Sequence, residues 1–147
     1  VPGAHSYEQA VEVARRIGLG QGEAEELFRR MVFNIMARNQ DDHVKNISFL
    51  MDRSGAWSLA PAYDVTYAYN PEGAWTGSHQ MTINGKRDDI THDDCLAAAR
   101  AMSIKEPRAR SIMIEVQDAT AQWPNFAEEA GLPEKIAASL QEHFVKL

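Results

Sequence analysis

The most constraining feature of the sequence is a dense polar segment, residues 38–46 (RNQDDHVKN), that directly follows a strongly apolar helical pattern. The apolar residues of this pattern recur at the three- and four-residue spacing of one helix face: Ala24, Leu27, Phe28, Met31 and Ile35. Val32, Phe33 and Met36 add apolar surface to the other faces, so the helix is expected to begin exposed and end buried. Polar side chains that leave a rigid, buried base are typical of binding and catalytic sites.

Short β elements are predicted after the polar segment. Residues 47–51 and 56–59 predict two strands joined by a tight turn that contains Asp and Gly. Residues 65–80, rich in Pro, Gly and polar side chains, predict a long, mobile loop. Residues 81–83 predict another strand, which Asn84-Gly85 closes with a strong turn signal. A small hairpin is therefore expected at the polar end of the molecule.

The rest of the chain has helical periodicity, with capping and stop signals at Gly18, Thr91, Pro107 and Pro133. The expected buried faces are, in chain order, Ala10, Val13, Ala14 and Ile17; Cys95, Ala98, Ala99 and Met102; Ile112, Val116, Ala119 and Trp123; and Ile136, Leu140 and Phe144. Trp57 is also expected in the core. The sequence predicts a single domain over residues 1–147, mostly α (α+β), with its small β element beside the polar segment.

Charge and composition exclude several functional classes. The chain has 15 basic and 21 acidic residues, a net charge of -6, which disfavours binding of nucleic acid or of an anionic membrane surface. No apolar run approaches the roughly 18 residues that a membrane span needs. The single cysteine, Cys95, excludes an internal disulfide and suits a reducing compartment, so we expect a cytoplasmic protein.

The order of polar residues around the hairpin suggests a reaction. Asp41 is followed by Asn46, then by the hairpin, then by Asp64, which is the order of the catalytic Asp, the metal-binding Asn and the metal-binding Asp in protein kinases. Carboxylate and amide oxygens suit Mg²⁺, a hard cation. Asp-x₄-Asn alone is also typical of a self-capping turn. His43 completes Asp-x-His-x-x-Asn, the catalytic-loop pattern of lipid kinases, and the combination favours phosphoryl transfer.

Two stretches resemble a known family. Residues 39–50 (NQDDHVKNISFL) and 59–65 (LAPAYDV) closely resemble the C-terminal lobe of HipA-type serine/threonine kinases, the toxins of bacterial toxin–antitoxin modules, and the resemblance continues through residues 79–86. It covers nearly the whole chain and implies the helical C-terminal lobe of a protein kinase-like fold. By the same resemblance, the site residues are Asp41 as catalytic base, Asn46 and Asp64 as metal ligands, and His43, Lys45 and Tyr63 on the phosphate side of the ATP site.

The resemblance also implies cofactors and partners. These are ATP and Mg²⁺, a protein substrate with a Ser or Thr acceptor, and a DNA-binding antitoxin protein. The 40 residues before Asp41 predict helices, and the glycines of residues 18–22 are better explained as a helix stop than as a phosphate loop. We therefore expect the N-terminal nucleotide-binding lobe to be absent from this chain and the chain alone to be inactive. Asp42 is expected to be structural, pointing away from the substrate.

Two other functions remain open at this point. The first is a non-catalytic helical domain that binds the antitoxin or a target protein. The second is a metal phosphohydrolase built on Asp41, Asp42, His43 and His92, although this set lacks a full complement of ligands. The presence of Asp41, Asn46 and Asp64 together favours the kinase, because a binding module needs none of them.

Overall fold

The fold is described from a computed structural model that covers residues 1–147. It contains six helices, one 3₁₀ turn and one two-stranded antiparallel sheet, which confirms the mostly α (α+β) class. The elements are α1 (Tyr7–Arg16), α2 (Gln21–Met36), the 3₁₀ turn η1 (Val44–Asn46), β1 (Phe49–Met51), β2 (Trp57–Leu59), α3 (His92–Ala101), α4 (Glu106–Ala121), α5 (Trp123–Glu129) and α6 (Glu134–Gln141). None of the helices is long and apolar enough to cross a membrane.

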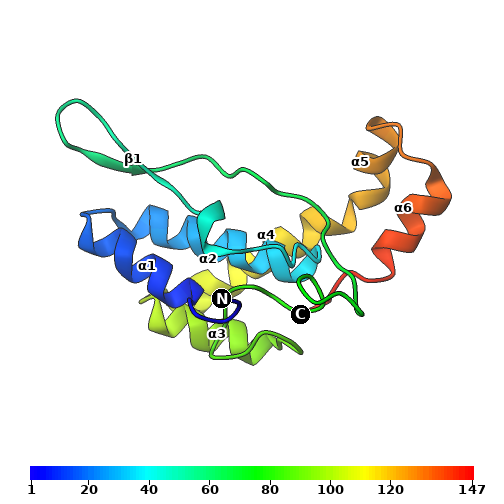
Figure 1. The fold of residues 1–147 in the computed structure, drawn as a ribbon, viewed down its shortest axis with the longest axis horizontal. Helices are drawn as coiled ribbons and strands as arrows, with labels where there is room; N and C mark the ends of the chain where they lie inside the picture. Colours follow the sequence, from blue (N-terminus) through cyan, green and yellow to red (C-terminus); the bar gives the residue numbers. More distant parts are fainter.

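Helix α2 lies at the centre of the core. It packs against both α1 and α4, and α3 closes the group by packing against α1 and α4 (Figure 1). The predicted spacing is confirmed, because Phe28, Met31 and Val32 are fully buried and the helix leads from an exposed start to a buried end. A long helix held on several sides is a rigid base for the polar segment that follows it.

Helix α1 presents a different face to the core from the one predicted. Ser6 caps it with a full capping box, and its buried residues are Tyr7, Val11 and Ala14. The prediction for Val13 is wrong, since this side chain is 46% exposed. Both faces of α1 have apolar residues at helical spacing, and the face that includes the large Tyr7 ring buries more apolar area.

The hairpin projects from the helices at the end of the molecule opposite α5 and α6 (Figure 1). Its register pairs Phe49 with Leu59 and Met51 with Trp57, which confirms the predicted hairpin. The prediction that Trp57 lies in the core is wrong: it is 42% exposed, because the hairpin extends beyond the helices.

The segment after the hairpin has no helix or strand from residue 60 to residue 80, as its Pro and Gly content predicts. The strand predicted at residues 81–83 is not formed. Thr82 and Ile83 make only isolated bridges, to Ser6 and Lys86, because no neighbouring segment runs alongside them for longer. The turn at Asn84-Gly85 is confirmed, with positive φ values of 50° and 76°.

The C-terminal helices agree only in part with the prediction. Thr91 caps α3, and Cys95, Ala98, Ala99 and Met102 are buried as expected. In α4, Ile112 and Val116 are buried, whereas Ala119 is exposed. Trp123 starts a separate helix, α5, and only half-buries its ring against Phe144. Ile136 is 49% exposed, because α6 packs mainly against α5 and buries the smaller Ala137 instead.

Candidate functional site

The polar segment begins where α2 ends. Ala37 is the C-cap residue of α2. The next residue, Arg38, takes a left-handed conformation with φ of 57°, which turns the chain sharply. The chain then pairs with the irregular segment that follows the hairpin, because Gln40 N–H donates to the Ala68 carbonyl and Ala68 N–H to the Arg38 carbonyl. The predicted loop at the end of a buried helix is thus confirmed, and its start is held by a segment distant in sequence.

Three side chains predicted for the site come together. Possible ligand atoms of Asp41, His43 and Asp64 all lie within 4.8 Å of one another. Asp41 and His43 are partly buried and Asp64 is exposed. Asp64 reaches the loop because the chain folds back over it, with Ala60 N–H donating to the Ser48 carbonyl. Asp41, His43 and Asp64 therefore share one side of the loop.

Asn46 and Tyr63 fix the geometry of this loop. The Asn46 amide donates to the Asp41 carbonyl at 3.2 Å, which ties the end of the loop to its start and leaves the amide oxygen without a protein partner. The Tyr63 hydroxyl donates to the Lys45 carbonyl at 2.6 Å and lies 2.5 Å from the Ser48 hydroxyl. Among the predicted site residues, His43, Asn46, Tyr63 and Asp64 line the neighbouring cleft, whereas the exposed Lys45 and the expected base Asp41 do not.

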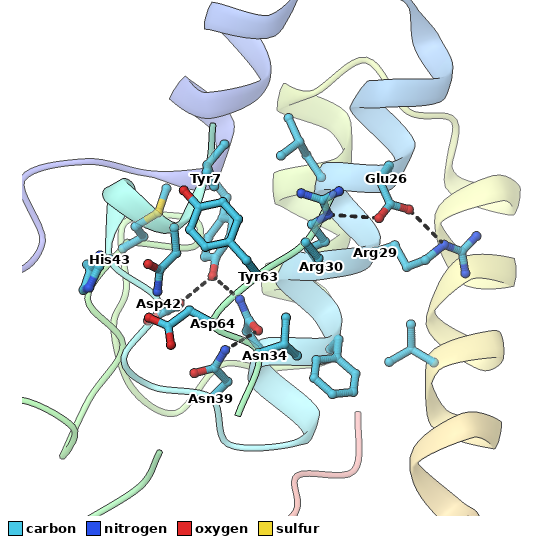
Figure 2. A pocket seen from close by; sticks show the side chains of 18 of the residues that line it. Tyr7, Glu26, Arg29, Arg30, Asn34, Asn39, Asp42, His43, Tyr63 and Asp64 are labelled. Atoms are coloured by element: carbon cyan, nitrogen blue, oxygen red, sulfur yellow. Dashed lines mark hydrogen bonds and ion pairs between the residues drawn. The ribbon is translucent and has the colours of Figure 1, made fainter. Parts of the chain in front are cut away.

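A cleft of about 310 Å³ opens beside these side chains, between α2, α4, the loop and residues 62–65. Figure 2 shows Tyr63 and Asp64 on one side of it and the α2 residues Glu26, Arg29 and Arg30 on the other. Both guanidinium groups are paired: Arg30 lies 2.9 Å from Glu26, and Arg29 lies 2.6 Å from Glu115. Apolar side chains, among them Phe33 and Val116, form much of the remaining wall.

Asp42 points into the protein, as expected. Its carboxylate is buried and accepts three hydrogen bonds, from the Tyr7 hydroxyl at 2.5 Å, His79 Nδ1 at 2.9 Å and Gln80 N–H at 2.8 Å. Burial and the Asp42 charge raise the pKa of Tyr7 well above its usual value, so the phenol stays protonated and can donate. These partners cannot be predicted from the sequence, because no local spacing links Tyr7 or His79 to the polar segment.

The donor set fits an oxygen-ligated cation. Asp64 contributes a carboxylate, Asn46 a free amide oxygen, and both line the same cleft. Mg²⁺ takes such oxygen ligands at about 2.0–2.1 Å and usually completes its shell with phosphate and water. His43 offers nitrogen, a poor ligand for Mg²⁺. Its Nδ1 is buried without a hydrogen-bond partner.

The alternative phosphohydrolase set is not assembled. His92 lies in α3, where its ring contacts Arg110 at 3.3 Å, and it does not belong to the Asp41 cluster. Asp42 lines the cleft, but its buried carboxylate already accepts three hydrogen bonds from the protein, so it is not free to act as a second metal-binding carboxylate. That set of four residues therefore does not form a metal site.

A comparison with models of protein families shows to which family this chain is related. The model of the HipA-like C-terminal domain matches residues 2–123. The chain belongs to this family. In the HipA-like domain described here, the matched range spans α1 to α4 and includes the polar segment, the hairpin and Asp64. A comparison with the curated proteins finds no match.

Proposed function

We propose that this chain is the catalytic C-terminal lobe of a HipA-like serine/threonine protein kinase. Joined to an N-terminal nucleotide-binding lobe, it transfers the γ-phosphoryl group of ATP to a Ser or Thr hydroxyl of a protein. The observation that carries this proposal is the meeting of Asp41, His43 and Asp64 within 4.8 Å, although they come from the loop and from a segment beyond the hairpin.

Each residue has a distinct part in the proposed reaction. Asp41 accepts the proton of the attacking hydroxyl and orients its oxygen toward the phosphorus. Asn46 and Asp64 would hold Mg²⁺ through their side-chain oxygens, which would place its charge beside the phosphate oxygens. His43 faces the same point and donates a hydrogen bond to a phosphate oxygen. The hydrogen bond from the Asn46 side-chain amide to the Asp41 carbonyl limits the separation between the metal ligand and the base.

The N-terminal lobe is needed because binding and positioning of the nucleotide supply most of the rate in phosphoryl transfer. Residues 7–36 form α1, α2 and their connector, with no strand that could carry a phosphate-binding lysine. Lys45 is in the 3₁₀ turn of the catalytic loop and does not fill that role. By family membership, we further propose a toxin of a toxin–antitoxin module whose partner is a DNA-binding antitoxin.

Radiolabelled ATP tests this proposal directly. The chain alone and the chain joined to its N-terminal lobe are each incubated with Mg²⁺ and a mixture of protein substrates. We expect label on protein Ser or Thr only with the joined form, and loss of the label when EDTA removes the metal.

Absence of transfer by the joined form, together with retained binding of the antitoxin, would contradict the kinase. It would support the non-catalytic binding domain instead. Transfer by the chain alone would show that the nucleotide-binding role given to the N-terminal lobe is wrong.

A further inference from the structure

A continuous, largely buried hydrogen-bond network forms part of the wall of the candidate cleft and centres on Asp42. One Asp42 oxygen accepts from both the Tyr7 hydroxyl and His79 Nδ1, and the other accepts from the Gln80 N–H. Tyr7, Asp42 and His79 are each at most 3% exposed. A buried carboxylate is costly unless it is hydrogen-bonded, and here three donors satisfy it.

The network returns to the start of the same loop. The Tyr7 hydroxyl accepts from Asn34 Nδ2 at 2.9 Å, and Asn34 Oδ1 accepts from Asn39 Nδ2 at 3.0 Å. Figure 2 shows this series of contacts running from Asp42 through Tyr7 and Asn34 to Asn39. Helices α1 and α2 and the segment at residues 79–80 therefore all hold the stretch of chain that contains Asp41.

The direction of Asp42 determines the directions of its neighbours. Successive side chains of an extended backbone point to opposite sides. His43 is extended, with φ of −73° and ψ of 157°. Asp42 is buried, whereas Asp41 and His43 are partly exposed and lie near each other, which agrees with side chains that point to different sides of the chain. Rotation of the chain at Asp42 would therefore turn both site residues away from Asp64.

We propose that Asp42 is a positioning residue, whose hydrogen bonds to Tyr7, His79 and Gln80 hold Asp41 and His43 in the direction needed for phosphoryl transfer. This inference rests on the proposed kinase function. It assigns no contact with substrate to Asp42, and it makes α1, through Tyr7, part of the support of the catalytic loop.

The test uses two buried carboxylates of this chain, each changed to the isosteric amide in the joined, two-lobe protein. Asp42→Asn replaces one acceptor oxygen by a donor, so at least one of its three donors loses its partner. Asp94→Asn is the matched control. Asp94 is also buried and accepts from Asn84, Lys86 and Thr91, but it caps α3 and has no contact with the site.

Both variants are expected to lower the melting temperature, and the kinetics separate them. Asp42→Asn should lower kcat about 100-fold and change the KM for ATP less than about threefold, because it misplaces the base, whereas the N-terminal lobe supplies most of the nucleotide binding. Asp94→Asn should keep kcat within about twofold. Tyr7→Phe, which removes a single donor, should give a smaller loss of kcat than Asp42→Asn.

A second readout does not depend on catalysis. In the 147-residue chain, Mn²⁺ bound by Asn46 and Asp64 should broaden the NMR signals of Asp64 and of the nearby Asp41, and Asp42→Asn should weaken the broadening at Asp41 while Asp94→Asn leaves it unchanged. A wild-type kcat in a folded Asp42→Asn protein overturns the positioning role. If the wild-type protein transfers no phosphate, the kinase proposal fails, and equal Mn²⁺ broadening in wild type and Asp42→Asn then overturns the inference independently.

Discussion

The polar loop at residues 38–46 has an irregular backbone but buried side chains, whereas the hairpin that follows it has a regular backbone but exposed side chains. The loop has a single 3₁₀ turn, yet Asn39, Gln40 and Asp42 are each at most 3% exposed. The hairpin has a regular antiparallel ladder, yet Leu50 and Trp57 are 53% and 42% exposed. Irregular backbone is thus fixed here by buried side-chain hydrogen bonds to other elements. Asp41, His43 and Asn46 lie on this fixed loop, and none of the candidate catalytic groups lies on the more regular but exposed hairpin.

The largest effect should come from Asp41→Asn in the joined protein. If Asp41 acts as the base, this change should lower kcat by about 10²–10⁴-fold and leave ATP affinity nearly unchanged, because the carboxylate acts mainly in the transition state. Steady-state phosphate transfer and ATP titration measure the two quantities. Asp52→Asn in the hairpin turn is the control and should keep full activity. Equal losses in both variants would contradict a special role for the loop.

The next effect is expected for Asp64→Asn. If Asp64 binds Mg²⁺, the neutral amide should weaken Mg·ATP binding by about 100-fold, because the charge that holds the cation is lost. Raising the Mg²⁺ concentration should restore part of the binding, which calorimetric titration at several concentrations would detect. Unchanged Mg·ATP affinity would remove Asp64 from the metal site and leave Asp41 as the only supported site carboxylate.

The stability of the two regions can be compared directly. Gln40 is 2% exposed, and its side chain joins Arg38 and the Thr76 carbonyl. Gln40→Ala should lower the free energy of unfolding by about 2 kcal/mol, because it leaves a buried cavity and an unpaired carbonyl. Trp57→Ala should cost about 1 kcal/mol or less, since much of the ring is already in water. Urea unfolding measures both, and a larger loss for Trp57 would reverse the contrast.

The smallest effect is expected for the stability of the hairpin turn at acidic pH. The Ser54 hydroxyl and the N–H of Ala56 donate to Asp52 and lower the pKa of its carboxyl below the usual value. A lowered pKa means that the stabilisation is present above the pKa of the unfolded chain and is lost as the pH falls through the folded value. NMR titration should therefore show the turn loosening only as the pH falls into the acidic range.

The local signals in the sequence were sufficient for much of the fold. The burial of α2, the Thr91 cap and the Asn84-Gly85 turn each depend on residues close together in the chain, and all three are confirmed. The proximity of Asp41 and Asp64 was expected from their order around the hairpin, and their ligand atoms do lie close together.

The remaining features depend on tertiary contacts. Tyr7 and His79 meet Asp42 only after three separate segments pack together, so no spacing rule relates them. Val13 was misplaced because α1 has two faces with apolar residues at helical spacing. The exposure of Trp57 depends on whether another layer covers the hairpin, which its own strand pattern does not determine.

The backbone of Asp64 has a consequence for how this family can change over evolutionary time. Its φ of 55° lies in the left-handed region, which β-branched and bulky residues avoid and which glycine, asparagine and aspartate tolerate. Few replacements at this position keep the local conformation, and asparagine is the closest in size and shape. A lineage that gave up catalysis but kept the fold for binding should therefore drift to asparagine or glycine here before any apolar residue.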